Sequence, residues 1–236
     1  MKNLSTLIML LLFTTLQAQS TKTFFNDADV FFKTYVKNGR VDYKSIKANP
    51  AKLDALVESV KSISVSTSNK NEYQAFWINT YNILVIKGVV DNYPVKQMLA
   101  INGFFDKTKY SAGGKSVTLN GIENNLLRAK FPKESRFHFV LVCGGLGCPP
   151  IISKAYKPST LESQLQRQTT IALNNANFIK VKGKKVQISQ IFEWYKGDFT
   201  HGGNLVDYIN KYRKEPLDPK TKLSYYTYNW TLNELR

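Results

Sequence analysis

The stretch "EYQAFWINTYNILVIKGVVDNYP", residues 72–94, is apolar on nearly every side when it is drawn as a helix. A helix with this pattern is usually buried inside a domain, because no polar face is left for solvent. Pro94 ends the stretch, since proline cannot continue the helical hydrogen bonding. The stretch therefore predicts a central buried helix around which the remaining elements pack.

This predicted helix also carries Glu72, Asn79 and Asn82, which fall near one stripe at steps of seven and three residues. A buried polar group without a partner costs about 1–3 kcal/mol, so something polar must pack against the stripe. Two roles are open for the asparagines. They either hold the backbone of a neighbouring loop or, together with Trp77 on the same helix, contact a substrate.

The segments around the central helix indicate an α+β fold. Helical spacing of apolar residues predicts helices over residues 24–38 and 50–61, ahead of the central helix. Later segments alternate around Gly113 and Gly183, as β-hairpins do, and are mixed with short helices. Because no βαβ alternation appears, we expect one mixed domain with a small, mostly antiparallel sheet rather than a doubly wound sheet.

The first residues, "MKNLSTLIMLLLFTTLQAQS", have the pattern of a secretory signal peptide, with Lys2, an apolar run and the small residue Ala18. The run is shorter than the roughly 20 residues that span a bilayer. We therefore expect cleavage near Ala18, so that residues 1–18 are the signal peptide and residues 19–236 form one exported domain. This domain is expected in the periplasm or outside the cell, as a monomer without a transmembrane segment.

The chain is strongly basic, with 33 Lys and Arg against 17 Asp and Glu and a formal net charge of +16. Its lysines are scattered, and the densest run is "KGKK" at residues 182–185. A basic charge without a clustered face does not indicate nucleic acid, so the expected partner is a small molecule, peptide or glycan. No cofactor or metal is expected, because a four-ligand site would need the distant His201 beside His138 and both cysteines.

A glycine-rich loop is the clearest candidate for chemistry. The stretch "RFHFVLVCGGLGCPP", residues 136–150, contains His138 and both cysteines of the chain, Cys143 and Cys148. In an oxidising compartment two nearby cysteines often form a disulfide. Alternatively, Cys143 or Cys148 is a nucleophile, with His138 as its base, Glu123 orienting the ring and the N–H groups of the turn binding an oxyanion. Redox exchange and metal binding are the remaining alternatives.

Strand geometry complicates a direct contact between His138 and Cys143. The run at residues 137–142 has the composition of a strand, and side chains on a strand alternate between faces. His138 then shares its face with Val140 and Val142. A direct pair requires the strand to end before Cys143, or Cys148 to fold back over the histidine.

Five blocks of the sequence, taken in order, resemble the DUF547 family. They are "AFWINTYNILVI", "GIENNLLR", "RFHFVLVCGGLGCPP", "ISQIFEWYKGDF" and "YYTYNWTLN", and together they cover about residues 70–233. The family is a domain of unknown function found in exported bacterial proteins and in some plant proteins. The resemblance implies that the loop cysteines, the histidine before them and Glu123 belong to the family pattern. The chain departs from it at Asn124, often histidine, and at Asn229, often aspartate.

The block around "IFEWYKGDF" places Trp194, Tyr195 and Asp198 on a short helix, where they either line a cleft or belong to the core. Three functions follow as hypotheses: a thiol-dependent hydrolase or acyl transferase, a non-catalytic glycan- or peptide-binding module with a structural disulfide, and a thiol–disulfide exchanger. The predicted catalytic residues are Cys143, His138, Glu123 and Cys148. The predicted substrate-binding residues are Asn79, Asn82, Trp77, Trp194 and Asp198.

Overall fold

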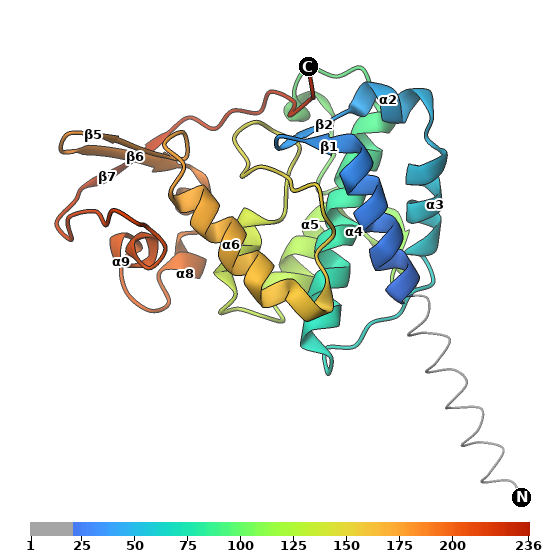
Figure 1. The fold of residues 1–236 in the computed structure, drawn as a ribbon, viewed down its shortest axis with the longest axis horizontal. Coiled ribbons are helices and arrows are strands. Elements are labelled where there is room, and N and C mark those ends of the chain that lie inside the picture. The colour runs from blue at the N-terminus through green and yellow to red at the C-terminus, as the bar shows by residue number, and fades with distance from the viewer. Residues whose placement is uncertain (1–20) are drawn as a thin grey trace, which may run out of the picture.

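The computed structural model describes residues 21–236, so the predicted signal peptide lies outside the described residues. Helix α4 (Lys70–Asp91) runs through the larger lobe of the molecule (Figure 1). The side chain of Asn69 caps it by accepting from the N–H of Glu72. Residues on all its sides are buried, which confirms the predicted central helix.

The N-terminal elements pack on α4. A helix covers residues 21–35, and helices α2 (Tyr43–Ala48) and α3 (Ala51–Ser59) follow, as Figure 1 shows. The prediction of one helix over residues 24–38 was wrong at its end. The chain turns at Asn38 and Gly39, whose φ angles are 51° and 75°, and this turn joins two short antiparallel strands, β1 (Val36–Lys37) and β2 (Arg40–Val41).

Both predicted hairpins are present. The turn around Gly113 joins β3 (Tyr110–Ala112) to β4 (Lys115–Val117), and the turn at Gly183 joins β5 (Ile179–Lys182) to β6 (Lys185–Ser189). Strand β7 (Leu223–Tyr226) adds to β6 in parallel, so only one of the two pairings in this sheet is antiparallel. The fold is α+β with small sheets.

The remaining elements are short helices, apart from one. Helix α6 (Leu161–Leu173) packs against the 3-10 helix η3 (Ser135–Phe139). The stretch around Glu123 forms a π-helix, η2 (Ile122–Arg128), a rare conformation that occurs frequently at functional sites. The other short helices are η1 (Met98–Ala100), α5 (Leu119–Gly121), η4 (Pro158–Thr160), α7 (Ile191–Trp194), α8 (Lys196–Phe199) and α9 (Leu205–Asn210).

The predicted strand at residues 137–142 was wrong, because this segment begins as η3 and continues as irregular backbone. The side chain of Asn82 supplies the hydrogen bonds that a neighbouring strand would give. Its Nδ2 donates to the carbonyl of Val140 at 2.9 Å, and its Oδ1 accepts from the N–H of Val142 at 2.9 Å. An amide on α4 therefore fixes this segment without a sheet.

The buried hydrophobic residues form two clusters, one around α4 and one around the sheet of β5, β6 and β7. The C-terminal segment, residues 227–236, contributes Leu232 to the first cluster and Tyr228 to the second, and it fixes the cysteine loop. The carbonyl of Trp230 accepts from Met98 at 3.0 Å, in the cluster around α4. The carbonyls of Asn229 and Thr231 accept from Gly147 and Leu146, each at 2.8 Å. Within residues 21–236, no helix is long and apolar enough to cross a membrane.

Candidate active site

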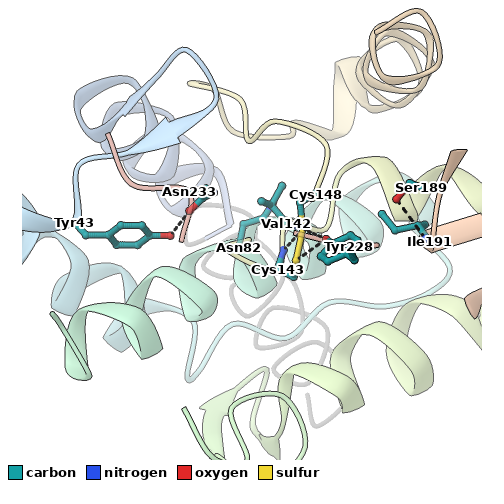
Figure 2. Close-up of a disulfide and its surroundings, with 9 residues drawn as sticks. All are labelled: Tyr43, Asn82, Val142, Cys143, Cys148, Ser189, Ile191, Tyr228 and Asn233. Atoms are coloured by element: carbon teal, nitrogen blue, oxygen red, sulfur yellow. Dashed lines mark hydrogen bonds between the residues drawn. A yellow bond between two sulfur atoms is a disulfide. The ribbon is translucent and has the colours of Figure 1, made fainter. Parts of the chain in front are cut away.

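The two cysteines of the loop form a disulfide, with their Cα atoms 6.4 Å apart (Figure 2). Glycine is required at position 147, because a Cβ there would lie 2.8 Å from the ring of Tyr228. Gly144 has a φ of 81°, in the left-handed region that glycine adopts without strain. The loop is thus held tightly against the C-terminal segment.

Several N–H groups of the cysteine loop donate within the protein. Those of Leu146 and Gly147 donate to the C-terminal segment, and that of Cys148 donates to the carbonyl of Gly145 at 3.2 Å. The N–H of Cys143 points to Cys148 Sγ at 3.0 Å. These four hydrogen bonds hold the shape of the loop, and the oxyanion site expected in the turn stays a prediction.

Tyr228 is the polar group closest to the disulfide, and its role was not predicted from the sequence. Its hydroxyl donates to Cys148 Sγ at 2.9 Å and lies 3.0 Å from Cys143 Sγ (Figure 2). Burial raises the pKa of this phenol far above its ordinary value. Tyr228 therefore remains a neutral hydrogen-bond donor beside the sulfurs.

His138 is held from two sides. Its Nε2 lies 2.8 Å from Oδ2 of Asp198, and its ring stacks on Tyr195 with the centroids 4.0 Å apart. The side chain of His138 is only 3% exposed, so it has no freedom to leave this position. Asp198 on α8 thus orients the histidine, which is the role that had been assigned to Glu123.

Arg128 completes this ionic network, and its role was not predicted from the sequence. Its Nε donates to Asp198 Oδ2 at 2.6 Å and its Nη2 to Oδ1 at 2.9 Å. Nη1 donates to Asn124 on the same π-helix. Burial raises the pKa of Asp198, but hydrogen bonds from His138 and Arg128 outweigh that effect and hold the pKa well below its usual range. Asp198 is therefore an ionised carboxylate.

All four predicted catalytic residues line one cavity of about 300 Å³. The side chains come from α4, η2, η3, the loop, α7 and the C-terminal segment, and most of the walls are aromatic. Trp194 is 47% exposed at the rim and stacks on Trp230. The lining residues are Tyr81, Phe105, Asn120, Glu123, His138, Leu141, Cys143, Cys148, Ile191, Trp194, Tyr195, Tyr228 and Trp230.

Glu123 is the only carboxylate among these lining residues. Burial raises the pKa of Tyr195 well above its ordinary value, and the charge of Glu123 raises it further. Burial likewise raises the pKa of Tyr81, with Glu123 again contributing. The cavity therefore presents neutral phenols and one acidic side chain. In the described part of the chain, no group of three or more His, Cys, Asp or Glu residues could hold a metal ion.

One protein family matches part of the chain. Residues 65–171 match the model of the family described as "Protein of unknown function, DUF547". This match confirms the resemblance to the DUF547 family over this part of the chain. No curated protein matches the chain, and no solved structure matches it.

The DUF547 match includes Glu123, Arg128, His138 and both cysteines, whereas Asp198 and Tyr228 lie beyond it. The site is therefore completed by the C-terminal part of the chain. Sequence spacing offers no signal for these contacts, because Arg128 and Asp198 are 70 residues apart and Cys148 and Tyr228 are 80 apart.

The DUF547 segment also contains three predicted substrate-binding residues that do not line the cavity. Asn79 donates to the carbonyl of Tyr156 at 2.7 Å and accepts from the N–H of Tyr156 at 2.9 Å. Asn82 makes the same pair of hydrogen bonds to the backbone of the segment before Cys143. Trp77 is buried against Gly113, where a Cβ would lie 2.7 Å from the indole. The two asparagines therefore hold the backbone of neighbouring segments, which is one of the two roles predicted for them.

Proposed function

We propose that this cavity is the active site of an exported thiol-dependent hydrolase or acyl transferase, whose resting form contains the Cys143–Cys148 disulfide. The observation that carries the proposal is that one cavity contains both sulfurs and a histidine whose Nε2 is bound by the carboxylate of Asp198. Cysteine nucleophiles activated by an oriented histidine share this arrangement. The signal-like residues 1–20 and the disulfide support export.

The disulfide must open before a thiol can react. A thiol or dithiol reductant supplies two electrons and two protons, the S–S bond breaks, two thiols form, and the reductant becomes a disulfide. We assign the nucleophile to Cys143, because the preceding residue, Val142, is fixed by its hydrogen bond to Asn82. A nucleophile on rigid backbone keeps its geometry through the reaction. In the resting form, Cys148 keeps Cys143 unreactive through the disulfide.

His138 serves as the base in this proposal. Since Asp198 is ionised, it accepts the proton of Nε2, which leaves the lone pair on Nδ1. Nδ1 makes no hydrogen bond within residues 21–236, so it is free to take the proton of the Cys143 thiol. The thiolate attacks the carbonyl carbon and a C–S bond forms. The C–N or C–O bond then breaks, and the leaving group takes the proton from His138.

Water completes hydrolysis of the resulting thioester. His138 accepts a proton from the attacking water, the C–S bond breaks, and the thiol regains its proton. In an acyl transferase an amine or alcohol takes the place of water. Tyr228 donates beside the reacting sulfur, and Asn120 offers an amide at the cavity wall. These are further candidates for stabilising the oxyanion, besides the N–H groups of the turn.

The test compares Cys143→Ser with Cys148→Ser in the mature protein, using a chromogenic ester and a peptide anilide with and without dithiothreitol. The wild type should act only after reduction, Cys143→Ser should be inactive in both states, and Cys148→Ser should act without reductant. A positioned base contributes roughly 10²–10⁴-fold, so His138→Gln should lose activity on that scale. Identical rates for all variants with and without dithiothreitol would sink the proposal. Circular dichroism verifies that each variant is folded.

A non-catalytic binding module is the second candidate, and the closed disulfide together with the exposed Trp194 favours it. In that case the disulfide is a structural staple and the stacked Trp194 and Trp230 form a platform for a glycan or peptide. Ligand binding would then survive replacement of both cysteines by serine, with a loss of stability only. Binding that is unchanged in Trp194→Ala would count against the platform.

A further inference from the structure

A second cavity, of about 580 Å³, lies on the other side of the cysteine loop. Its walls are the β1–β2 turn, the loop from Gly145 to Pro150, strand β5 and the C-terminal segment. Cys148 lines both cavities, so the loop is a wall that they share. The two cavities nevertheless differ in chemistry, because the first is mostly aromatic and the second is mostly polar.

The lining of the second cavity is cationic and rich in amides. It contains Arg40 and Lys180 and no Asp or Glu. The guanidinium of Arg40 makes no ion pair or side-chain hydrogen bond within residues 21–236. Lys180 places its Nζ 3.9 Å from the ring centroid of Tyr226, and no carboxylate pairs with it in the same residues. The asparagines of the lining are Asn38, Asn175, Asn177, Asn229 and Asn233.

The positive charge continues from the cavity along the β5–β6 hairpin. Lys182 faces Lys185 directly across the two strands, and Lys184 lies in the turn. Like charges in opposed positions destabilise a hairpin. In the described part of the chain, none of these lysines forms an ion pair. The hairpin therefore keeps an uncompensated positive field beside the cavity.

We propose that this second cavity binds an acidic saccharide, with Arg40 and Lys180 on its carboxylate or sulfate group and the asparagine amides on its hydroxyls. Arginine and lysine are the side chains suited to such anions. The volume lies within the range of small-molecule sites, about 300–1,000 Å³. The site is separate from the proposed thiol chemistry and does not depend on it.

The aromatic side chains of the cavity argue for a sugar rather than a nucleic acid. Single-stranded nucleic acids need open aromatic faces on which their bases stack. Here the face of Tyr226 is covered by Lys180, and Phe178 is only 6% exposed. Amides remain as the groups that a ligand contacts, and they suit the hydroxyls of a saccharide.

The experiment is calorimetric titration of the mature protein with three disaccharides: one with a uronic acid carboxylate, one sulfated, and maltose as the neutral reference. We expect the acidic disaccharides to bind and maltose not to bind, with the affinity falling between about 50 and 200 mM salt, as for any charge-driven contact. The preference between carboxylate and sulfate identifies the anionic group. Binding of maltose as tight as that of both acidic sugars, or no binding of either acidic sugar, would overturn the proposal.

Variants test the residues. Arg40→Gln and Lys180→Gln should each weaken binding about tenfold or more, since each removes a charge-assisted contact. Lys115→Gln, an exposed lysine on β4, is the matched control and should bind like the wild type. His138→Gln, a change in the first cavity at a residue that does not line the second, should also retain binding, which separates this site from the thiol site. Tighter binding of a single-stranded oligonucleotide that is lost in both Gln variants would assign the cavity to nucleic acid instead.

Discussion

Two networks of polar side chains, one on α4 and one around His138, are built differently. On α4, the amides of Asn79 and Asn82 bond to backbone N–H and carbonyl groups, and neither lines the first cavity. In the second network, His138, Asp198 and Arg128 bond to one another through ionisable side chains, and His138 faces that cavity. The amides of the first network are engaged with backbone groups, whereas Nδ1 of His138 makes no hydrogen bond within residues 21–236. Satisfied amides thus serve the fold, and the ionic network serves the proposed reaction.

The comparison is tested most strongly by Asp198→Asn. This change removes the charge that orients His138, and loss of an orienting carboxylate in a triad costs up to about 10⁴-fold in rate. We expect kcat/KM of the reduced protein toward a chromogenic ester to fall by about 10³-fold, which corresponds to about 4 kcal/mol. Asp106→Asn, at an exposed carboxylate, is the control and should not change the rate. Equal rates for both variants would remove the distinction between the networks.

The opposite result is expected for Asn82→Ala. It leaves the carbonyl of Val140 and the N–H of Val142 buried without partners, and each unsatisfied group costs about 1–3 kcal/mol. The free energy of unfolding, measured with urea, should fall by about 3 kcal/mol. Asn26→Ala, at an exposed asparagine in the N-terminal helix, should stay within about 0.5 kcal/mol of the wild type. A stable Asn82→Ala protein would show that the segment does not depend on this amide.

The sequence predicts the elements that depend on local patterns, but not the long-range contacts of these two networks. The apolar run of α4 and the glycine turns at Gly113 and Gly183 are local patterns, and each produced the predicted element. The segment at 137–142 has the composition of a strand, yet it does not pair because Asn82, distant in sequence, satisfies its backbone. Hydrophobic periodicity carries no information about such a contact.

The candidate site shows the same limit. The thiols, His138 and Glu123 were predicted from residue chemistry and from the family blocks, and they line one cavity. The orienting role was assigned to Glu123, but the structure places Asp198 on His138. Arg128 was missed because its charge also suits the end of a helix, and only its long-range contact to Asp198 distinguishes the two roles.

The smallest expected effect concerns acid stability of the ionic network. Hydrogen bonds from His138 and Arg128 depress the pKa of Asp198 in the folded protein, despite the opposing effect of burial. A depressed carboxyl pKa stabilises the fold above the unfolded pKa of about 3.9, and this contribution is lost as the pH falls toward the folded pKa. Because Asp198 is 20% exposed, the contribution is on the order of 1 kcal/mol after screening by solvent.

This effect is measured by urea unfolding of the wild type and Asp198→Asn from pH 7 to about pH 2. The wild type should be the more stable of the two at neutral pH, and the difference should shrink below about pH 4, since only the wild type has a carboxylate to protonate there. Arg128 stays charged throughout this range, so it does not contribute to the change. Asn82→Ala has no such carboxyl at its site and should differ from the wild type by the same amount at every pH. A difference for Asp198→Asn that is equally constant would mean that the ionic network, like the amides of α4, does not stabilise the fold through its charge.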